Sequence, residues 1–442
     1  MFAGLGRFIV RRKKSVLILF IIGILAAGGV GSLAFSKLDS GGYSDLGSES
    51  AKAYDYLTEK FKVQEPAAIL VVDTQNRNVN DPAVIAEAAA LEAQVKTVAN
   101  VDRTLSYWST GGAPAMKAAD DKAAFLFIYS KAEANDWASL EKVGKEVQAK
   151  FDGKQGNFIV HASGGGVITH AINSKIQKDL ALAEAIAIPL TFVLMAFVFG
   201  AMVASAMPLF VGVSAILGSF LIIYIFTLFT DVSVFALNLI TGLGLGLGID
   251  YALLIVNRFR EELHAGKSVD DSVVATVATA GKTVFYSGLT VFVTLASLLL
   301  FPLNFLKSFG YAGVSVISLA VLGALIPLPA LLAILGHKID KGVVRKSAIT
   351  PKEDGRWAQT ARMVMRRPVA IVLLALMVLG IFAAPLKNIA FSQGDSRMLP
   401  ASNAAAIATA VQADRFAGQT TNPVEIIVMG GAGKDAEIAS YA

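Results

Sequence analysis

The sequence predicts a polytopic α-helical membrane protein that carries a separate α+β domain outside the membrane. Hydrophobic residues make up 55% of the 442 residues and charged residues 17%, and the mean hydropathy is +0.60. These values exceed what a water-soluble domain tolerates. The spacing of the apolar runs predicts the separate domain, because one long polar stretch lies between the first run and the second.

Seven apolar runs approach the ~20 residues that a helix needs to cross a bilayer. We expect transmembrane helices at 16–35, 181–199, 206–229, 232–256, 284–303, 309–335 and 368–386. The first run is followed by the polar stretch 36–180, whereas the second to sixth runs are crowded within 181–336. The expected organisation is therefore one helix, one domain, five helices, a linker at 337–367 and a seventh helix.

Basic residues set the expected orientation, because lysine and arginine collect on the cytoplasmic side of a membrane. Five of them precede the first run: Arg7, Arg11, Arg12, Lys13 and Lys14. The loops that alternation then assigns to the cytoplasm are also basic, while the short outer loops carry little besides Lys307. We expect a plasma membrane protein with residues 1–15 and the linker in the cytoplasm and residues 36–180 outside it.

Within 36–180, runs rich in β-forming residues alternate with helical patterns. We expect strands from Ala67, Ala123 and Asn157, a short additional one near 101–107, and helices at 82–98 and 136–151. Two β-α-β units of this size are typical of a ferredoxin-like α+β domain. The same residues contain no catalytic triad and no phosphate-binding loop, so a binding domain is expected there and not an enzyme.

An internal repeat bears on both ends of the chain. The segment RRKKSVLILFIIGILAAGGVGSLAFS from Arg11 is echoed by RRPVAIVLLALMVLGIFAAPLKNIAFS from Arg366, and PAAILVVD from Pro66 by PVEIIVMG from Pro423. A helix duplicated in mid-chain favours a retained anchor at 16–35 over the alternative, a cleavable signal peptide. Residues 387–442 are then expected to begin a second, truncated domain, and two full repeats would give about twelve helices.

Composition excludes several classes of function. The chain has no cysteine, and its four histidines have no metal-ligand spacing, so we expect neither thiol chemistry nor a metal site. The net charge of +5 is modest, and its basic residues flank apolar segments. This pattern fits orientation in a bilayer and not nucleic-acid binding.

The expected functional centre is an aspartate in the fourth apolar run. On a helix, Gly242, Gly246 and Asp250 share one side within about 80° of arc, and Asn257 returns to that side. The glycines give a surface that a neighbouring helix can approach closely. A charged aspartate there costs ~2.5–3.5 kcal/mol, and burial without a partner favours its protonated form. Asp250 is expected to gain and lose a proton; the alternative is a permanently protonated hydrogen-bond donor that pins two helices.

The next apolar run carries a stripe of hydroxyl side chains at helical spacing. Its members are Thr283, Ser287, Thr290, Thr294 and Ser297. They either line a polar pathway beside Asp250 or bond back to their own helix backbone.

Several segments resemble the MmpL branch of the resistance-nodulation-division (RND) transporters. The resemblance lies in MFAGLGRFIVRRKKSVLIL at the start, SGGYSDLGSESAKA after the first helix, GLGLGLGIDYALLIVNRFREEL from Gly242, and AGKTVFYSGLTVFVTLASLLLFPLNFLKSFGYAG from Ala280. It covers the whole chain but about half of a typical member, and it implies an RND-type bundle with an extracytoplasmic porter domain. It also implies secondary transport driven by the proton gradient, without a bound cofactor.

In this resemblance Asp250 and Tyr251 form one half of a proton relay. The matching Asp-Tyr pair belongs to the tenth helix, which this chain lacks, so the C-terminal half is an expected partner. Family substrates are envelope lipids and glycolipids such as trehalose monomycolate. Three alternatives stay open: a multidrug or secondary-metabolite exporter of the same fold, a SecDF-like auxiliary subunit, and a sterol-sensing-type protein that exports no lipid.

Overall fold

Seven of the described helical segments are long and apolar enough to cross a membrane, in agreement with the sequence. The computed structural model describes residues 1–38, 41–42, 45, 47–131, 136–344, 356–389, 395–416, 427–428 and 433–441. The seven segments are Lys13–Ser36, Gly165–Phe199, Met202–Phe226, Ala236–His264, Val269–Leu300, Asn304–Asp340 and Pro368–Asn388. The chain therefore has the helices of a polytopic membrane protein.

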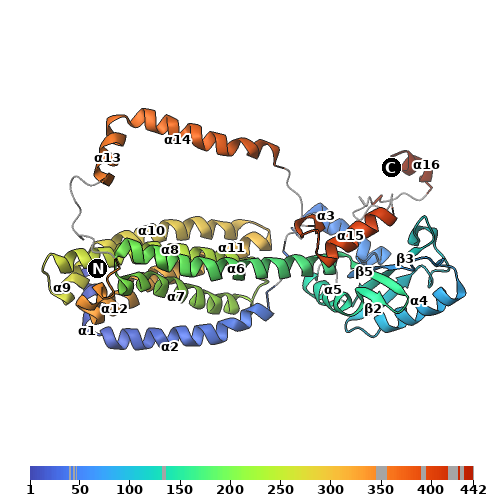
Figure 1. Ribbon diagram of the computed structural model, residues 1–442, viewed down its shortest axis with the longest axis horizontal. Helices are drawn as coiled ribbons and strands as arrows, with labels where there is room; N and C mark the ends of the chain where they lie inside the picture. Colours follow the sequence, from blue (N-terminus) through green and yellow to red (C-terminus); the bar gives the residue numbers. More distant parts are fainter. Residues whose placement is uncertain are drawn as a thin grey trace.

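The first six of these segments form one elongated bundle (Figure 1). Its long helices are α2 (Lys13–Gly31), α6 (Gly165–Phe199), α7 (Met202–Phe226), α8 (Ala236–His264), α10 (Ala280–Ala296) and α11 (Asn304–Leu325). One continuous cluster of apolar side chains, including Val211, Ile240, Phe259 and Ile317, is fully buried between them. Helices suit this environment because each satisfies its own backbone hydrogen bonds in hydrocarbon.

Short helices cover the end of the bundle that lies away from the α+β domain, which we call the distal end (Figure 1). They are α1 (Phe2–Arg11), α9 (Val269–Ala278) and α12 (Pro327–Leu335). Gly6 lets α1 pack directly on α9, because a Cβ there would lie 3.0 Å from the Cα of Val274. The apolar run 309–335 is broken before Pro327, which starts α12 at a position where a helix tolerates proline.

The α+β domain contains one antiparallel sheet with strand order β2-β3-β1-β5-β4. The predicted elements are present in order as β1 (Ala68–Asp73), α4 (Pro82–Val95), β2 (Val101–Ser106), β3 (Ala123–Ser130), α5 (Trp137–Phe151) and β5 (Phe158–Ser163). The edge strand β4 (Gly153–Gln155) was not predicted, because three residues are too few for a periodic pattern. Leu70, Leu126 and Val160 of the sheet are fully buried in the core that α4 and α5 share.

Helix α6 belongs to both parts of the molecule. It begins at Gly165 in the α+β domain and runs without a break to Phe199 at the distal end, with Pro189 inside it. The expected boundary at 180/181 therefore falls within a continuous helix. Figure 1 shows α6 as the rod that joins the sheet to the bundle.

A helix from the second repeat packs on the sheet of the α+β domain. Helix α15 (Ala404–Arg415) lies against β5 and β1, although these residues were expected to begin a second domain (Figure 1). The guanidinium of Arg415 is 2.7 Å from the carboxylate of Asp73. The ring of Phe416 stacks on that of Phe125, with 3.7 Å between centroids. Residues far apart in the sequence thus complete one hydrophobic core.

Other parts of the second repeat make few contacts with the rest of the chain. Helices α13 (Arg356–Arg366) and α14 (Pro368–Ala383) lie apart from the bundle, and no residue of α14 is buried (Figure 1). The short helices α3 (Glu49–Tyr56) and α16 (Asp435–Tyr441) complete the described α-helices. The run from Pro423 that echoes β1 lies outside the described residues, except for 427–428.

Candidate functional site

Asp250 and Tyr251 lie in the middle of α8, where the sequence places them, but their side chains have opposite surroundings. Asp250 is exposed, and its carboxylate forms no ion pair with the described residues of the bundle. Tyr251 is 3% exposed, and its hydroxyl oxygen is buried without a hydrogen bond of ordinary geometry. Consecutive residues of a helix point about 100° apart, so a single turn presents a carboxyl outward and a phenol inward.

The Tyr251 hydroxyl lies where α8, α10 and α11 meet. Its polar neighbours are Ser287 of α10 and the adjacent Asp250. Gly288 makes this arrangement possible, since a Cβ there would lie 2.2 Å from Cγ2 of Val321 and 3.6 Å from the Tyr251 hydroxyl oxygen. The sequence analysis did not single out Gly288. The available signal is its position directly after Ser287, in the stripe of hydroxyl residues on α10.

The glycines of α8 form two faces. A Cβ on Gly248 would lie 2.6 Å from the Cα of Gly212 in α7, and one on Gly244 would lie 2.6 Å from Cγ1 of Ile216. No described atom would come within 4 Å of a Cβ on Gly242 or Gly246. The glycines in contact within this chain are therefore Gly244 and Gly248, which the analysis of the sequence did not single out. The face of Gly242, Gly246 and Asp250 stays open, and its role as a helix-packing surface stays a prediction.

The hydroxyl stripe, which runs along α10 to Ser297 directly after it, is exposed, and three of its members bond to backbone carbonyls of the preceding turn. Thr290 donates to the carbonyl of Tyr286 at 3.0 Å, Thr294 to that of Thr290 at 2.9 Å, and Ser297 to that of Thr294 at 2.6 Å. These bonds are the alternative that the sequence left open. Ser287 differs, because it is a polar neighbour of Tyr251.

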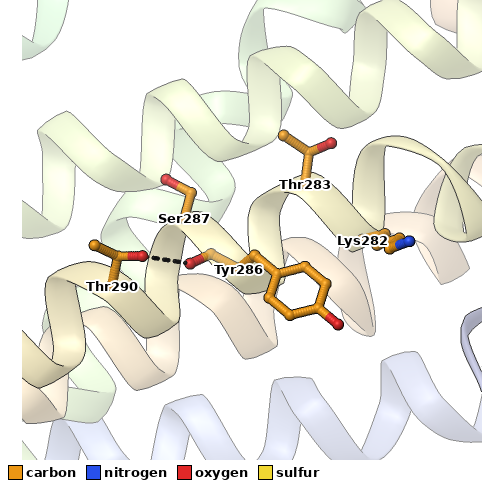
Figure 2. Close-up of a pocket in the computed structure, with 5 residues that line it drawn as sticks. All are labelled: Lys282, Thr283, Tyr286, Ser287 and Thr290. Carbon is orange, nitrogen blue, oxygen red and sulfur yellow. Dashed lines mark hydrogen bonds between the residues drawn. The ribbon is translucent and has the colours of Figure 1, made fainter.

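An open pocket of about 600 Å³ lies along α10 and is lined by Lys282, Thr283, Tyr286, Ser287 and Thr290. Figure 2 shows the Thr290 hydroxyl turned to the Tyr286 carbonyl, with Thr283 and Ser287 on the side of the helix away from the Tyr286 ring. Asn257 lies two turns beyond Asp250 on α8 and is half-buried. The structure brings Tyr251 and Ser287 together, and it leaves Asn257 and Thr294 apart from them.

The titratable and polar groups of this site are a carboxyl, a phenol and an aliphatic hydroxyl. Within the described part of the chain, no group of three or more His, Cys, Asp or Glu side chains could hold a metal ion. A carboxyl in a membrane-spanning helix changes its charge when it binds a proton, and that charge is costly in hydrocarbon. The phenol of Tyr251 and the hydroxyl of Ser287 can both donate and accept hydrogen bonds beside it.

Comparison with known proteins gives consistent matches along the chain. The model of the MMPL family matches residues 43–371. The chain is similar to a membrane protein of Streptomyces coelicolor, with 35% identity over 98% of this chain and 60% of the relative. It is also similar to the trehalose monomycolate exporter MmpL3 of Mycobacterium tuberculosis, with 28% identity over 97% of this chain and 48% of the relative.

A third relative is the mycolic acid-containing lipids exporter MmpL11 of Mycolicibacterium smegmatis, with 28% identity over 89% of this chain and 41% of the relative. The chain thus spans between 41% and 60% of the lengths of these three relatives. The family match includes the α+β domain, all of α8 with Asp250 and Tyr251, and the start of the second repeat. The chain belongs to the MMPL family.

Proposed function

We propose that this chain is part of a secondary transporter, not an enzyme, that exports a lipid or glycolipid of the cell envelope. Two of the relatives are named as exporters of trehalose monomycolate and of mycolic acid-containing lipids. The more similar Streptomyces relative carries no substrate in its name. The proposal therefore commits to the class of envelope lipids, with a trehalose monomycolate-like glycolipid as its best-supported member.

The observation that carries the proposal is the position of Asp250. It lies on the open face of a membrane-spanning helix, without an ion-pair partner among the described residues of the bundle, beside a buried tyrosine hydroxyl. Charging it in hydrocarbon costs about 2.5–3.5 kcal/mol, so proton binding changes the relative free energy of two helix positions by a similar amount. A proton gradient then shifts the populations of two states with different proton affinity.

In this proposal Asp250 and Tyr251 act as one half of the relay, and Gly242 and Gly246 admit a facing helix. The relatives are longer than this chain, and we assign the facing helix, with a second Asp-Tyr pair, to the remainder of a longer protein. The α+β domain acts as a ferredoxin-like porter domain outside the cytoplasm. The basic residues around the first helix support this orientation.

The experiment is the Asp250→Asn substitution in the protein at its native length and expression level. We expect loss of lipid export to the outer surface and an unchanged amount of folded protein in the membrane, because Asn fills the same space but binds no proton. Asp231→Asn, in an exposed loop residue before α8, is the matched control and should export normally. Undiminished lipid export by Asp250→Asn would exclude the relay. If cells with this variant accumulate a small metabolite and not a lipid, the result would favour the multidrug alternative.

A further inference from the structure

Arg260 joins the end of α8 to the end of α6 at the distal end of the bundle. Its side chain is 8% exposed, and Nη1 donates to the carbonyl oxygen of Phe199 at 2.9 Å. Phe199 is the last residue of α6, and Gly200 ends the helix in the left-handed conformation. The last carbonyls of a helix lack partners within it and carry partial negative charge, so a buried guanidinium is well suited to cap them.

The rest of the Arg260 guanidinium binds Asp340 of η5 (Gly336–Asp340). Nε donates to Oδ1 of Asp340 at 2.8 Å, and Nη2 lies 2.7 Å from the same oxygen. The other carboxylate oxygen of Asp340 is 3.2 Å from Nε2 of His264, whose Nδ1 is 2.6 Å from the carbonyl oxygen of Arg260. Among the described residues, Asp340 and His264 are the titratable groups against or beside this guanidinium, and α6 contributes an uncharged carbonyl.

Backbone hydrogen bonds join the residues directly after η5 to the turn after α6. Val344 donates its amide to the carbonyl of Gly200, and Met202 donates to the carbonyl of Gly342, both at 2.9 Å. The ends of α6, α8 and η5 therefore meet at one buried arginine. Lysine could not replace it, because a single ammonium does not span a carboxylate and a carbonyl in two directions as a planar guanidinium does.

The other end of α6 is fixed to the α+β domain with equal closeness. A Cβ on Gly144 of α5 would lie 2.3 Å from the carbonyl carbon of Gly166, and one on Gly166 would lie 2.2 Å from the carbonyl oxygen of Leu140. Glu141 of α5 accepts from Nδ2 of Asn173 at 2.9 Å on the facing surface of α6. Backbones in direct contact move together, because protein interiors are close-packed and transmit strain.

We propose that Arg260 is a positioning residue that transmits the movement of α8 to α6 and, through the α5 contact, to the α+β domain. This inference rests on the proposed function, which places the proton-driven step at Asp250 ten residues earlier on the same helix. When α8 shifts, the guanidinium carries the last turn of α6 with it. The continuous α6 then moves the start of the helix at Gly165, next to the sheet.

The test measures distances between spin labels on engineered cysteines in the full-length protein, at acidic and alkaline pH in lipid bilayers. Three exposed positions serve: Ala265 directly after α8, Val198 in the last turn of α6, and Met363 on α13 as a reference in the second repeat. In the unaltered protein, the two distances to Met363 should change together with pH, and the distance between Ala265 and Val198 should stay constant.

In Arg260→Gln, we expect the distance from Ala265 to Met363 to keep its pH-dependent change and that from Val198 to Met363 to lose it. Arg258→Gln is the matched control, because Arg258 pairs only with Glu261 and Glu262 of its own helix among the described residues; all changes should persist. If Arg260→Gln does not fold, Arg260→Lys and Asp340→Asn provide the same comparison with a partial loss.

The outcomes separate the two proposals. An unchanged pH response of Val198 in a folded Arg260 variant would overturn the role of Arg260. A pH response of Ala265 that persists in Asp250→Asn would instead overturn the proton-driven step itself.

Discussion

The two glycine faces of α8 contain the same residue at the same spacing and meet opposite surroundings. Gly244 and Gly248 leave no room for a side chain, because backbone of α7 and side chains of α7 and α11 lie against them. Gly242 and Gly246 meet no described atom, and Asp250 continues their face. The glycine repeat of α8 therefore defines two surfaces, of which one packs within the described bundle and the other is open.

The largest expected effect is that of Gly248→Leu. Its side chain would have to displace the backbone of Gly212, 2.6 Å away, and overpacking of this kind costs about 3 kcal/mol or more. We expect little folded protein, measured as monodisperse yield and melting temperature in detergent. Gly246→Leu is the control on the open face. Equal yields of the two variants would remove the difference between the faces.

Gly246→Leu should act on transport and not on folding. Its side chain fills the surface that we propose for the facing helix beside Asp250, so export should fall by about tenfold or more, equivalent to about 1.4 kcal/mol. Lipid export in cells, normalised to the amount of protein in the membrane, measures this effect. Normal export by a well-folded Gly246→Leu protein would argue against an approaching helix at this face.

Within the closed face, Gly244→Ala should be milder than Gly248→Ala. The added methyl group at Gly244 meets the side chain of Ile216, which can change rotamer, whereas at Gly248 it meets backbone. We expect a loss of about 1 kcal/mol for Gly244→Ala and about 2 kcal/mol for Gly248→Ala. Thermal unfolding of the two purified variants side by side checks the order, and a reversed order would contradict the contacts.

The smallest expected effect is that of Thr294→Val on α10. The Thr294 hydroxyl bonds back to the carbonyl of Thr290, so its loss should change stability by less than about 0.5 kcal/mol and leave export normal. Ser287→Ala should reduce export, because Ser287 is the polar neighbour of Tyr251. If Ser287→Ala exports as well as Thr294→Val, Ser287 takes no part in the relay.

Local pattern was sufficient for the elements that depend on it. The length of each apolar run predicted the seven spanning segments, and runs rich in β-forming residues predicted β1, β3 and β5, because these signals depend on neighbouring residues alone. Asp250 was found in the same way, as a charge in an apolar run. Its exposure and the burial of Tyr251 depend on which helices surround α8, which no local pattern encodes.

The features that were missed depend on distant contacts. Helical spacing grouped Gly242 with Gly246. It could not show that Gly212 of α7 lies against Gly248, which makes Gly248 a close backbone contact between α7 and α8. The packing of α15 on β5 joins residues hundreds of positions apart through Arg415 and Asp73. In the sequence, Arg260 is one of several basic residues that follow the fourth apolar run, and only the fold brings the last carbonyl of α6 to it.

The proton-relay role of Asp250 is tested most directly by measuring its protonation state in the full-length protein. Infrared difference spectroscopy between acidic and alkaline pH makes this measurement. We predict a protonated-carboxyl band that is present at acidic pH, declines as the pH is raised, and is missing in Asp250→Asn. The matched variant Asp231→Asn should keep the band. A band that depends on Asp250 but does not change with pH would show a permanently protonated structural donor and would contradict the account.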